Sequence, residues 1–182
     1  MDNHTKIKIA VSGAAAGDCS VRGKELAIAV GRELTKHDCI ILTGATTGVP
    51  EYVAQGAHEG GGMVIGFSPA ASQKQHEHTY KLPMHHHDII FYSGFGYAHR
   101  NTLLTTLSDA VITICGRIGT LNEFTTSFEE NKIIGVLLGS GGIADEIPHI
   151  IEIAKRGPGH IVYSHDPKEL VEKVIEAVNN TK

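Results

Sequence analysis

Cysteine and tryptophan are scarce in this sequence, which has no tryptophan, 5% aromatic residues and only three cysteines among 182 residues. An odd number of cysteines without a CxxC pair is unlike a disulfide framework or a structural zinc site. We therefore expect Cys19, Cys39 and Cys115 to be reduced thiols. Cys115 comes directly after a strand, and we interpret it as an inert core residue rather than a reactive low-pKa thiol.

Long apolar runs and an excess of basic residues are also missing. No stretch approaches 18 apolar residues, and the run that follows Lys6 is too short for the apolar region of a signal peptide. The formal net charge of −4 gives no sign of binding to nucleic acid or to an acidic membrane surface. We therefore expect a soluble cytoplasmic protein that has neither of these partners.

The common nucleotide-binding and hydrolase fingerprints are absent. No GxGxxG follows the first apolar run, and neither GxxxxGK[ST] nor GxSxG occurs. The stretch from Gly13 to Gly17 has two spaced glycines but lacks both the paired glycine and an acidic residue about 20 positions later. These absences argue against a dinucleotide-dependent dehydrogenase, a P-loop NTPase and an α/β-hydrolase.

Short apolar, β-branched runs alternate with segments of helical periodicity, which predicts an α/β fold with a doubly wound, mostly parallel sheet (Rossmann-like). We expect a single domain over residues 1–182, with an irregular, histidine-rich segment at 70–88. The predicted strands are 7–11, 39–43, 63–67, 89–92, 110–114, 133–138 and 161–163, and the predicted helices are 21–36, 50–60, 98–107, 123–130, 147–155 and 166–178.

Small residues gather where these strands end, and ligands of doubly wound sheets bind beyond the carboxyl ends of the strands. We therefore predict a ligand site there, made of Ser12, Gly13, Gly44, Thr47, Gly48, Gly116, Arg117, Gly119 and Thr120.

The stretch Gly116–Glu123 lies between a predicted strand and a predicted helix. A glycine-bearing turn that leads into a helix presents free backbone N–H groups and suits an anion, which Glu123 would face. An alternative fits the same residues, because Thr120 and Glu123 have the spacing of a helix capping box. The residues alone leave both interpretations open.

The pattern Gly116-x-x-Gly119-Thr120-x-x-Glu123 resembles the PGGxGTxxE signature of the Lonely Guy (LOG) family, also called lysine-decarboxylase-like. Arg100 precedes Glu123 by 23 residues, as the paired arginine does in that family, and segments 43–51 and 56–69 resemble two further family motifs. The resemblance implies a dimer or higher homo-oligomer that binds phosphorylated nucleosides. It also implies N-glycosidic hydrolysis of nucleoside 5′-monophosphates, with Glu123 and Arg100 as the catalytic pair.

Several positions depart from that signature. Cys115 replaces its proline, Arg117 replaces its second glycine, and 97–101 reads Tyr-Ala-His-Arg-Asn instead of Met-His-Glu-Arg-Lys, so that the second acid is missing. The superfamily also includes molybdenum-cofactor carriers. A phosphoribohydrolase and a non-catalytic carrier of a nucleotide or pterin cofactor therefore both remain open, and a metal-responsive or scaffold protein is a third alternative. Arg117 would clamp a phosphate, plug the pocket or point to solvent.

Histidines concentrate at His76, His78 and 85–87. Neutral imidazoles bind zinc or nickel, and His85 and His87 would share one face of an extended segment. No acidic residue or cysteine has the spacing that would complete a structural site. We therefore expect a solvated loop beside the pocket, with no metal site and no resident cofactor.

Overall fold

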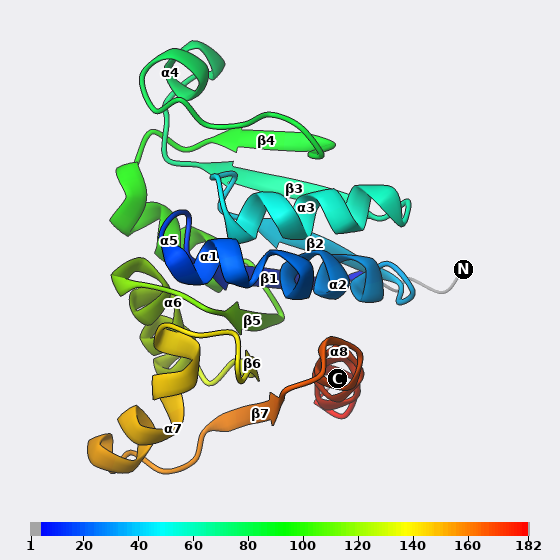
Figure 1. Cartoon of the computed structure of the whole chain (residues 1–182), viewed down its shortest axis with the longest axis vertical. Helices are drawn as coiled ribbons and strands as arrows, with labels where there is room; N and C mark the ends of the chain where they lie inside the picture. Colours follow the sequence, from blue (N-terminus) through cyan, green and yellow to red (C-terminus); the bar gives the residue numbers. More distant parts are fainter. Residues whose placement is uncertain (1–4, 182) are drawn as a thin grey trace.

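In the computed structural model, which describes residues 5–181, the strands form one seven-stranded parallel sheet in the order β4-β3-β2-β1-β5-β6-β7 (Figure 1). The first residues of the chain, where we expected no leader, lie partly outside the described range. The strands are β1 (Ile7–Gly13), β2 (Cys39–Thr43), β3 (Met63–Ser68), β4 (Ile89–Tyr92), β5 (Ala110–Ile114), β6 (Ile133–Leu137) and β7 (His160–Ser164).

Helices cover both faces of the sheet. On one face α2 packs between α3 and α8, and on the other α6 packs between α5 and α7. Figure 1 shows α4 beyond the β4 edge. The helices are α1 (Asp18–Arg22), α2 (Lys24–Leu34), α3 (Val49–Glu59), α4 (Gln73–His78), α5 (Gly96–Thr106), α6 (Ile118–Glu129), α7 (Ile143–Ala154) and α8 (Pro167–Asn179).

The central strands are apolar because both of their faces are covered. Every residue of β5 and of β6 is buried. Successive residues of one strand belong to different layers: Ile9 and Val11 pack with α2, α3 and α8, whereas Ala10 packs with Leu104 of α5. Burying each large aliphatic side chain contributes about 1.5–3 kcal/mol, so these strands hold the two layers together.

The predicted α/β class with a doubly wound sheet is confirmed, and all seven strands lie where we expected them. The errors concern helices. The helix expected at 21–36 is divided at Gly23, whose N–H bonds to the Cys19 carbonyl. The segment 70–88 contains α4, whose first turn is capped by the Ser72 hydroxyl. α7 begins at Ile143 and has Pro148 inside it.

The cysteine prediction is wrong for two of the three residues. Cys19 and Cys115 form a disulfide with 5.8 Å between their Cα atoms, and only Cys39 is a free, buried cysteine. Burial raises the pKa of the Cys39 thiol to about 11. The paired residues are 96 positions apart in sequence, but they follow adjacent strands of the sheet. The thiol count therefore no longer supports the cytoplasmic location that we expected.

The site described below lies at the point where the strand order changes direction. β1 pairs with β2 on one side and with β5 on the other. From β1 the chain moves outward through β2, β3 and β4, and from β5 it moves outward on the other side through β6 and β7. The connections after β1 and β5 therefore leave in opposite directions and open a crevice at the sheet edge. No helix within residues 5–181 is long and apolar enough to cross a membrane.

Candidate functional site

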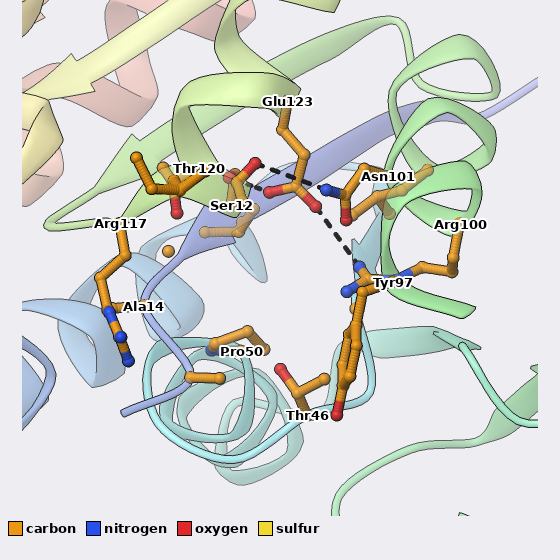
Figure 2. Close-up of a pocket in the computed structure, with 17 residues that line it drawn as sticks. Ser12, Ala14, Thr46, Pro50, Tyr97, Arg100, Asn101, Arg117, Thr120 and Glu123 are labelled. Carbon is orange, nitrogen blue, oxygen red and sulfur yellow. Dashed lines mark hydrogen bonds and ion pairs between the residues drawn. The ribbon is translucent and has the colours of Figure 1, made fainter. Parts of the chain in front are cut away.

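A cavity of about 310 Å³ opens at the carboxyl ends of β1, β2 and β5, bounded by α5 and the first turns of α6 (Figure 2). A volume near 300 Å³ is at the lower end of the range for small-molecule pockets. Its walls are formed by Val11, Ser12, Gly13, Ala14, Ala15, Gly44, Thr46, Pro50, Tyr97, Arg100, Asn101, Leu104, Arg117, Ile118, Gly119, Thr120 and Glu123.

The floor of the cavity carries a buried ion pair. Arg100 of α5 and Glu123 of α6 are only 6% and 5% exposed, and Arg100 Nη1 lies 3.4 Å from Glu123 Oε1. The Ser12 hydroxyl, at the end of β1, donates to Glu123 Oε2. The fold thus brings together three residues from distant parts of the sequence, and Figure 2 shows Glu123 between Ser12 and Arg100.

Burial governs the protonation of this pair. It raises the pKa of the Glu123 carboxyl, against the opposing effects of the Arg100 charge and the Ser12 hydrogen bond. Burial also lowers the pKa of Arg100, which the Glu123 charge partly offsets. At 3.4 Å the contact is longer than a strong charge-assisted hydrogen bond, so the pair does not fully repay the loss of water.

Arg100 retains hydrogen-bonding capacity that the protein does not use. Its Nε atom is buried and has no hydrogen-bond partner among residues 5–181, although buried donors are nearly always paired. Gly44 lies against the guanidinium group, because a Cβ there would be 2.2 Å from Arg100 Nη1. The lack of a side chain at Gly44 thus makes room for the Arg100 guanidinium group beside an open cavity. This arrangement suits a bound anion.

Asn101 extends the polar floor on the α5 side. With the amide orientation assigned from its partners, its nitrogen donates to Glu123 Oε1 and to the Tyr97 carbonyl oxygen, both at 2.9 Å. Glu123 Oε1 thus faces two donors from α5, and the carboxylate is held in one position.

The first turn of α6 is open to an anion. Arg117 is the N-cap residue, no side chain caps the free N–H groups, and the first turn has no acidic residue. Gly116 has φ +114° and packs against the Thr120 side chain. The capping-box alternative is wrong, because α6 begins at Ile118 and the Glu123 carboxylate contacts Ser12 and Arg100 instead.

Most of the residues predicted from the strand ends line the cavity. They are Ser12, Gly13, Gly44, Arg117, Gly119 and Thr120, together with Arg100 and Glu123. Thr47, Gly48 and Gly116 do not. The Thr47 hydroxyl bonds to the Ala15 carbonyl, Gly48 packs on the backbone of residues 14 and 15, and Gly116 lies beneath Thr120.

Apart from Arg100, the sequence prediction missed the α5 wall. The wall is one face of α5, because intervals of three, one and three residues separate its members Tyr97, Arg100, Asn101 and Leu104. Reading that face around Arg100 would have identified the other three residues. Ala14, Ala15, Thr46, Pro50 and Ile118 carry no polar pattern that distinguishes them.

The histidine-rich segment is less solvated than we expected, and no histidine lines the cavity. His76 is fully buried, and its two ring nitrogens bond to Ser68 Oγ (2.8 Å) and the Pro83 carbonyl oxygen (3.0 Å). His87 Nε2 bonds to Thr43 Oγ1 at 2.8 Å. His86 has φ +65°, so 85–87 is a turn and not an extended segment. Among residues 5–181 no three His, Cys, Asp or Glu side chains converge as a metal site.

Comparisons with known proteins agree with this architecture. The model of the SLOG cluster4 family matches residues 6–171. An uncharacterized protein of Archaeoglobus fulgidus is 28% identical over 122 residues, which are 67% of this chain and 75% of that protein.

Two solved structures are similar along the whole fold. The molybdenum cofactor binding protein of Rippkaea orientalis is 25% identical with a TM-score of 0.72, and the match covers 97% of this chain and 98% of that one. The Moco carrier protein of Chlamydomonas reinhardtii is 22% identical with a TM-score of 0.77, covering 98% and 100%. The narrower resemblance to the Lonely Guy family is not confirmed by these comparisons.

Proposed function

The chain belongs to the SLOG cluster4 family, and from that premise we propose that its pocket binds a phosphorylated nucleotide or pterin cofactor and carries it without cleaving it. The observation that carries the proposal is Arg100, a buried cation that lines the cavity at the switch in strand order. The likeness to proteins described as molybdenum cofactor binders and carriers supports a pterin ligand.

The pocket offers an anionic ligand two kinds of donor. The free N–H groups at the start of α6 and the positive end of its dipole suit a phosphate, and Arg117 adds a cation at the exposed rim. Arg100 supplies a second cation from the floor, and Figure 2 shows the two arginines on opposite sides of the cavity. Tyr97, half exposed, provides an aromatic face for a planar ring system.

Hydrolysis of a nucleoside 5′-monophosphate is the second candidate, because Glu123 and Arg100 lie together as the LOG resemblance implies. Two features weigh against it. Glu123 is the only carboxylate among the residues that line the cavity, so no second acid is available for proton transfer. Burial also raises the pKa of Glu123, which disfavours the charged carboxylate that would stabilise positive charge developing on a sugar.

Calorimetry and product analysis together separate the two functions. The purified protein is titrated with AMP, GMP and a pterin monophosphate, and with the matching dephosphorylated compounds. The same mixtures are then analysed by chromatography for free base. We expect binding that requires the phosphate and no release of base. Release of base that Glu123→Gln abolishes would establish the hydrolase instead.

A homo-oligomer, which the LOG resemblance implies, stays part of the proposal. The edge strand β4 exposes Ile89 and Phe91, and Phe95 and Tyr97 follow it with more than half or about half of their surface exposed. Apolar side chains along an edge strand favour association. Light scattering of the wild type and of Phe91→Glu at micromolar concentration tests this point.

A further inference from the structure

The Cys19–Cys115 bridge joins two segments that border the cavity. Cys115 immediately precedes the turn that carries Arg117 and Gly119, and Cys19 lies in α1, a few residues after Ala14 and Ala15. Both segments leave the sheet at the switch point, one after β1 and the other after β5. The bridge is therefore a covalent tie across one wall of the pocket.

One end of this tie is firmly held. Cys115 is fully buried, its N–H bonds to Ser140 Oγ at 2.7 Å, and its carbonyl oxygen accepts from the Ala144 N–H at 2.8 Å. Its φ of +55° is unusual for a residue with a side chain, and these two bonds help to maintain it. The turn before α6 is thus fixed to the loop between β6 and α7.

The other end is held less, although the Gly23 N–H bonds to the Cys19 carbonyl and Ser20 is buried. α1 has only five residues, Val21 is 68% exposed, and Cys19 is itself partly exposed. The bonds of Ala14 and Ala15 to the α3 side fix the start of this segment, but they do not reach α1. Gly17, between Ala15 and α1, lies near the Arg117 side chain: a Cβ built there would be 3.9 Å from Arg117 Cδ.

We propose that the Cys19–Cys115 disulfide is a reversible redox control of the pocket: the oxidised form holds α1 against the Arg117 turn, and reduction releases α1 and weakens ligand binding. The effect on the ligand rests on the proposed binding function. The structural change does not, because it concerns only the two loops that the bridge connects.

The chemistry is thiol–disulfide exchange with a dithiol reductant. A thiolate of the reductant attacks Sγ of Cys19, the less buried of the two residues, and Cys115 Sγ leaves as a thiolate and takes up a proton. The second thiol of the reductant then displaces Cys19 Sγ from the mixed disulfide. The reductant departs as its own cyclic disulfide, so two electrons and two protons have passed to the protein.

The experiment compares the full chain after oxidation by glutathione disulfide and after reduction by dithiothreitol. Alkylation in denaturant, read by mass spectrometry, should find one free thiol in the oxidised form, at Cys39, and three in the reduced form. Hydrogen exchange should rise on reduction in residues 16–22. The Kd for AMP or a pterin monophosphate should rise about tenfold on reduction.

Two variants provide controls. Cys19→Ser should match the reduced wild type and lose its response to dithiothreitol, whereas Cys39→Ser should behave as the wild type in both states. Three alkylated thiols after oxidation, or equal exchange of residues 16–22 in the two forms, would overturn the redox control. Faster exchange on reduction with an unchanged Kd would overturn its effect on the ligand. If neither form binds any phosphorylated probe, the proposed binding function fails, and the exchange measurement still decides the structural part.

Discussion

Arg100 and His76 are both buried basic side chains that lie just beyond the carboxyl ends of strands, but the protein treats them differently. Both ring nitrogens of His76 are bonded to the chain, to Ser68 and to the Pro83 carbonyl oxygen. Arg100 has an Nε without a partner, a long contact to Glu123 and a cavity beside it. A buried polar group that the chain satisfies completes the fold. Arg100 also lines the cavity at the switch in strand order, where its guanidinium group can meet a ligand.

The largest effects on binding and stability are expected when Arg100 and His76 are each replaced by an apolar residue. Arg100→Met should raise the Kd for a phosphorylated ligand about ten- to a hundredfold, since a hydrogen bond to a charged group contributes about 1.5–3 kcal/mol. His76→Leu should leave the Kd unchanged and lower the free energy of unfolding by about 1–3 kcal/mol, because it orphans buried polar atoms. Calorimetry and urea unfolding measure the two quantities.

Arg32→Met is the matched control for the arginine, because Arg32 is exposed and pairs with Glu59 away from the cavity. Arg32→Met should change neither the Kd for the ligand nor the free energy of unfolding by much. If His76→Leu weakened binding as strongly as Arg100→Met, the distinction between the two buried residues would be wrong.

Gly116 and Gly119, on either side of the start of α6, allow a second comparison between a structural residue and a ligand-binding residue. A Cβ at Gly119 would meet only the Asn101 side-chain amide, at 3.8 Å, so Gly119→Ala should fold normally and weaken binding by crowding the ligand, about tenfold. A Cβ at Gly116 would lie 2.5 Å from Thr120 Cγ2, and φ there is +114°. Gly116→Ala should therefore lower the melting temperature. Normal binding by a folded Gly119→Ala protein would show that the ligand does not contact the start of α6.

The pH dependence of stability tests the state of Glu123. Its pKa in the folded protein is raised above the ordinary value of 4.5, so the folded protein holds a proton that the unfolded chain has released. The stability from that proton is fully present below pH 4.5 and is lost as the pH rises through the folded pKa. Relative to Glu123→Gln, the wild type should lose free energy of unfolding as the pH rises above 4.5. Urea unfolding at a series of pH values would show a constant difference if burial did not control this group.

The smallest effect is expected in the histidine-rich segment. Replacing His85, His86 and His87 together should leave ligand affinity nearly unchanged, because none of them lines the cavity. Loss of the bond from His87 to Thr43 should lower the free energy of unfolding by about 0.5–1.5 kcal/mol. Calorimetry with zinc and with ligand gives the comparison, and a tight zinc isotherm abolished in the triple variant would show that this segment binds metal.

The fold was predictable from the sequence because buried parallel strands leave a strong local pattern. The run Ala110–Ile114 is apolar and β-branched, and it is a central strand with both faces covered. The start of α6 was harder to predict, because Thr120 and Glu123 satisfy a local capping rule that a longer-range contact overrides. Glu123 bonds to Ser12, 111 residues away, and no local pattern contains that distance.

The candidate site was predictable in part for the same reason. Glycines at strand ends identify where the backbone turns, so Gly13, Gly44 and Gly119 led to the cavity. Their individual roles depend on neighbours from other elements, as Gly44 does on Arg100. The Cys19–Cys115 pair was missed because sequence spacing says nothing about residues that follow two adjacent parallel strands.

The central claim is that Arg100 and the start of α6 hold a phosphorylated cofactor. Native mass spectrometry of the wild type and of Arg100→Met, purified side by side without dialysis, tests it most directly. We expect the wild type to carry a small anion that denaturation releases and whose fragments contain phosphate, and the variant to lack it. The same adduct on both proteins would contradict the claim, as would a bare wild type that takes up no AMP or pterin monophosphate when these are added.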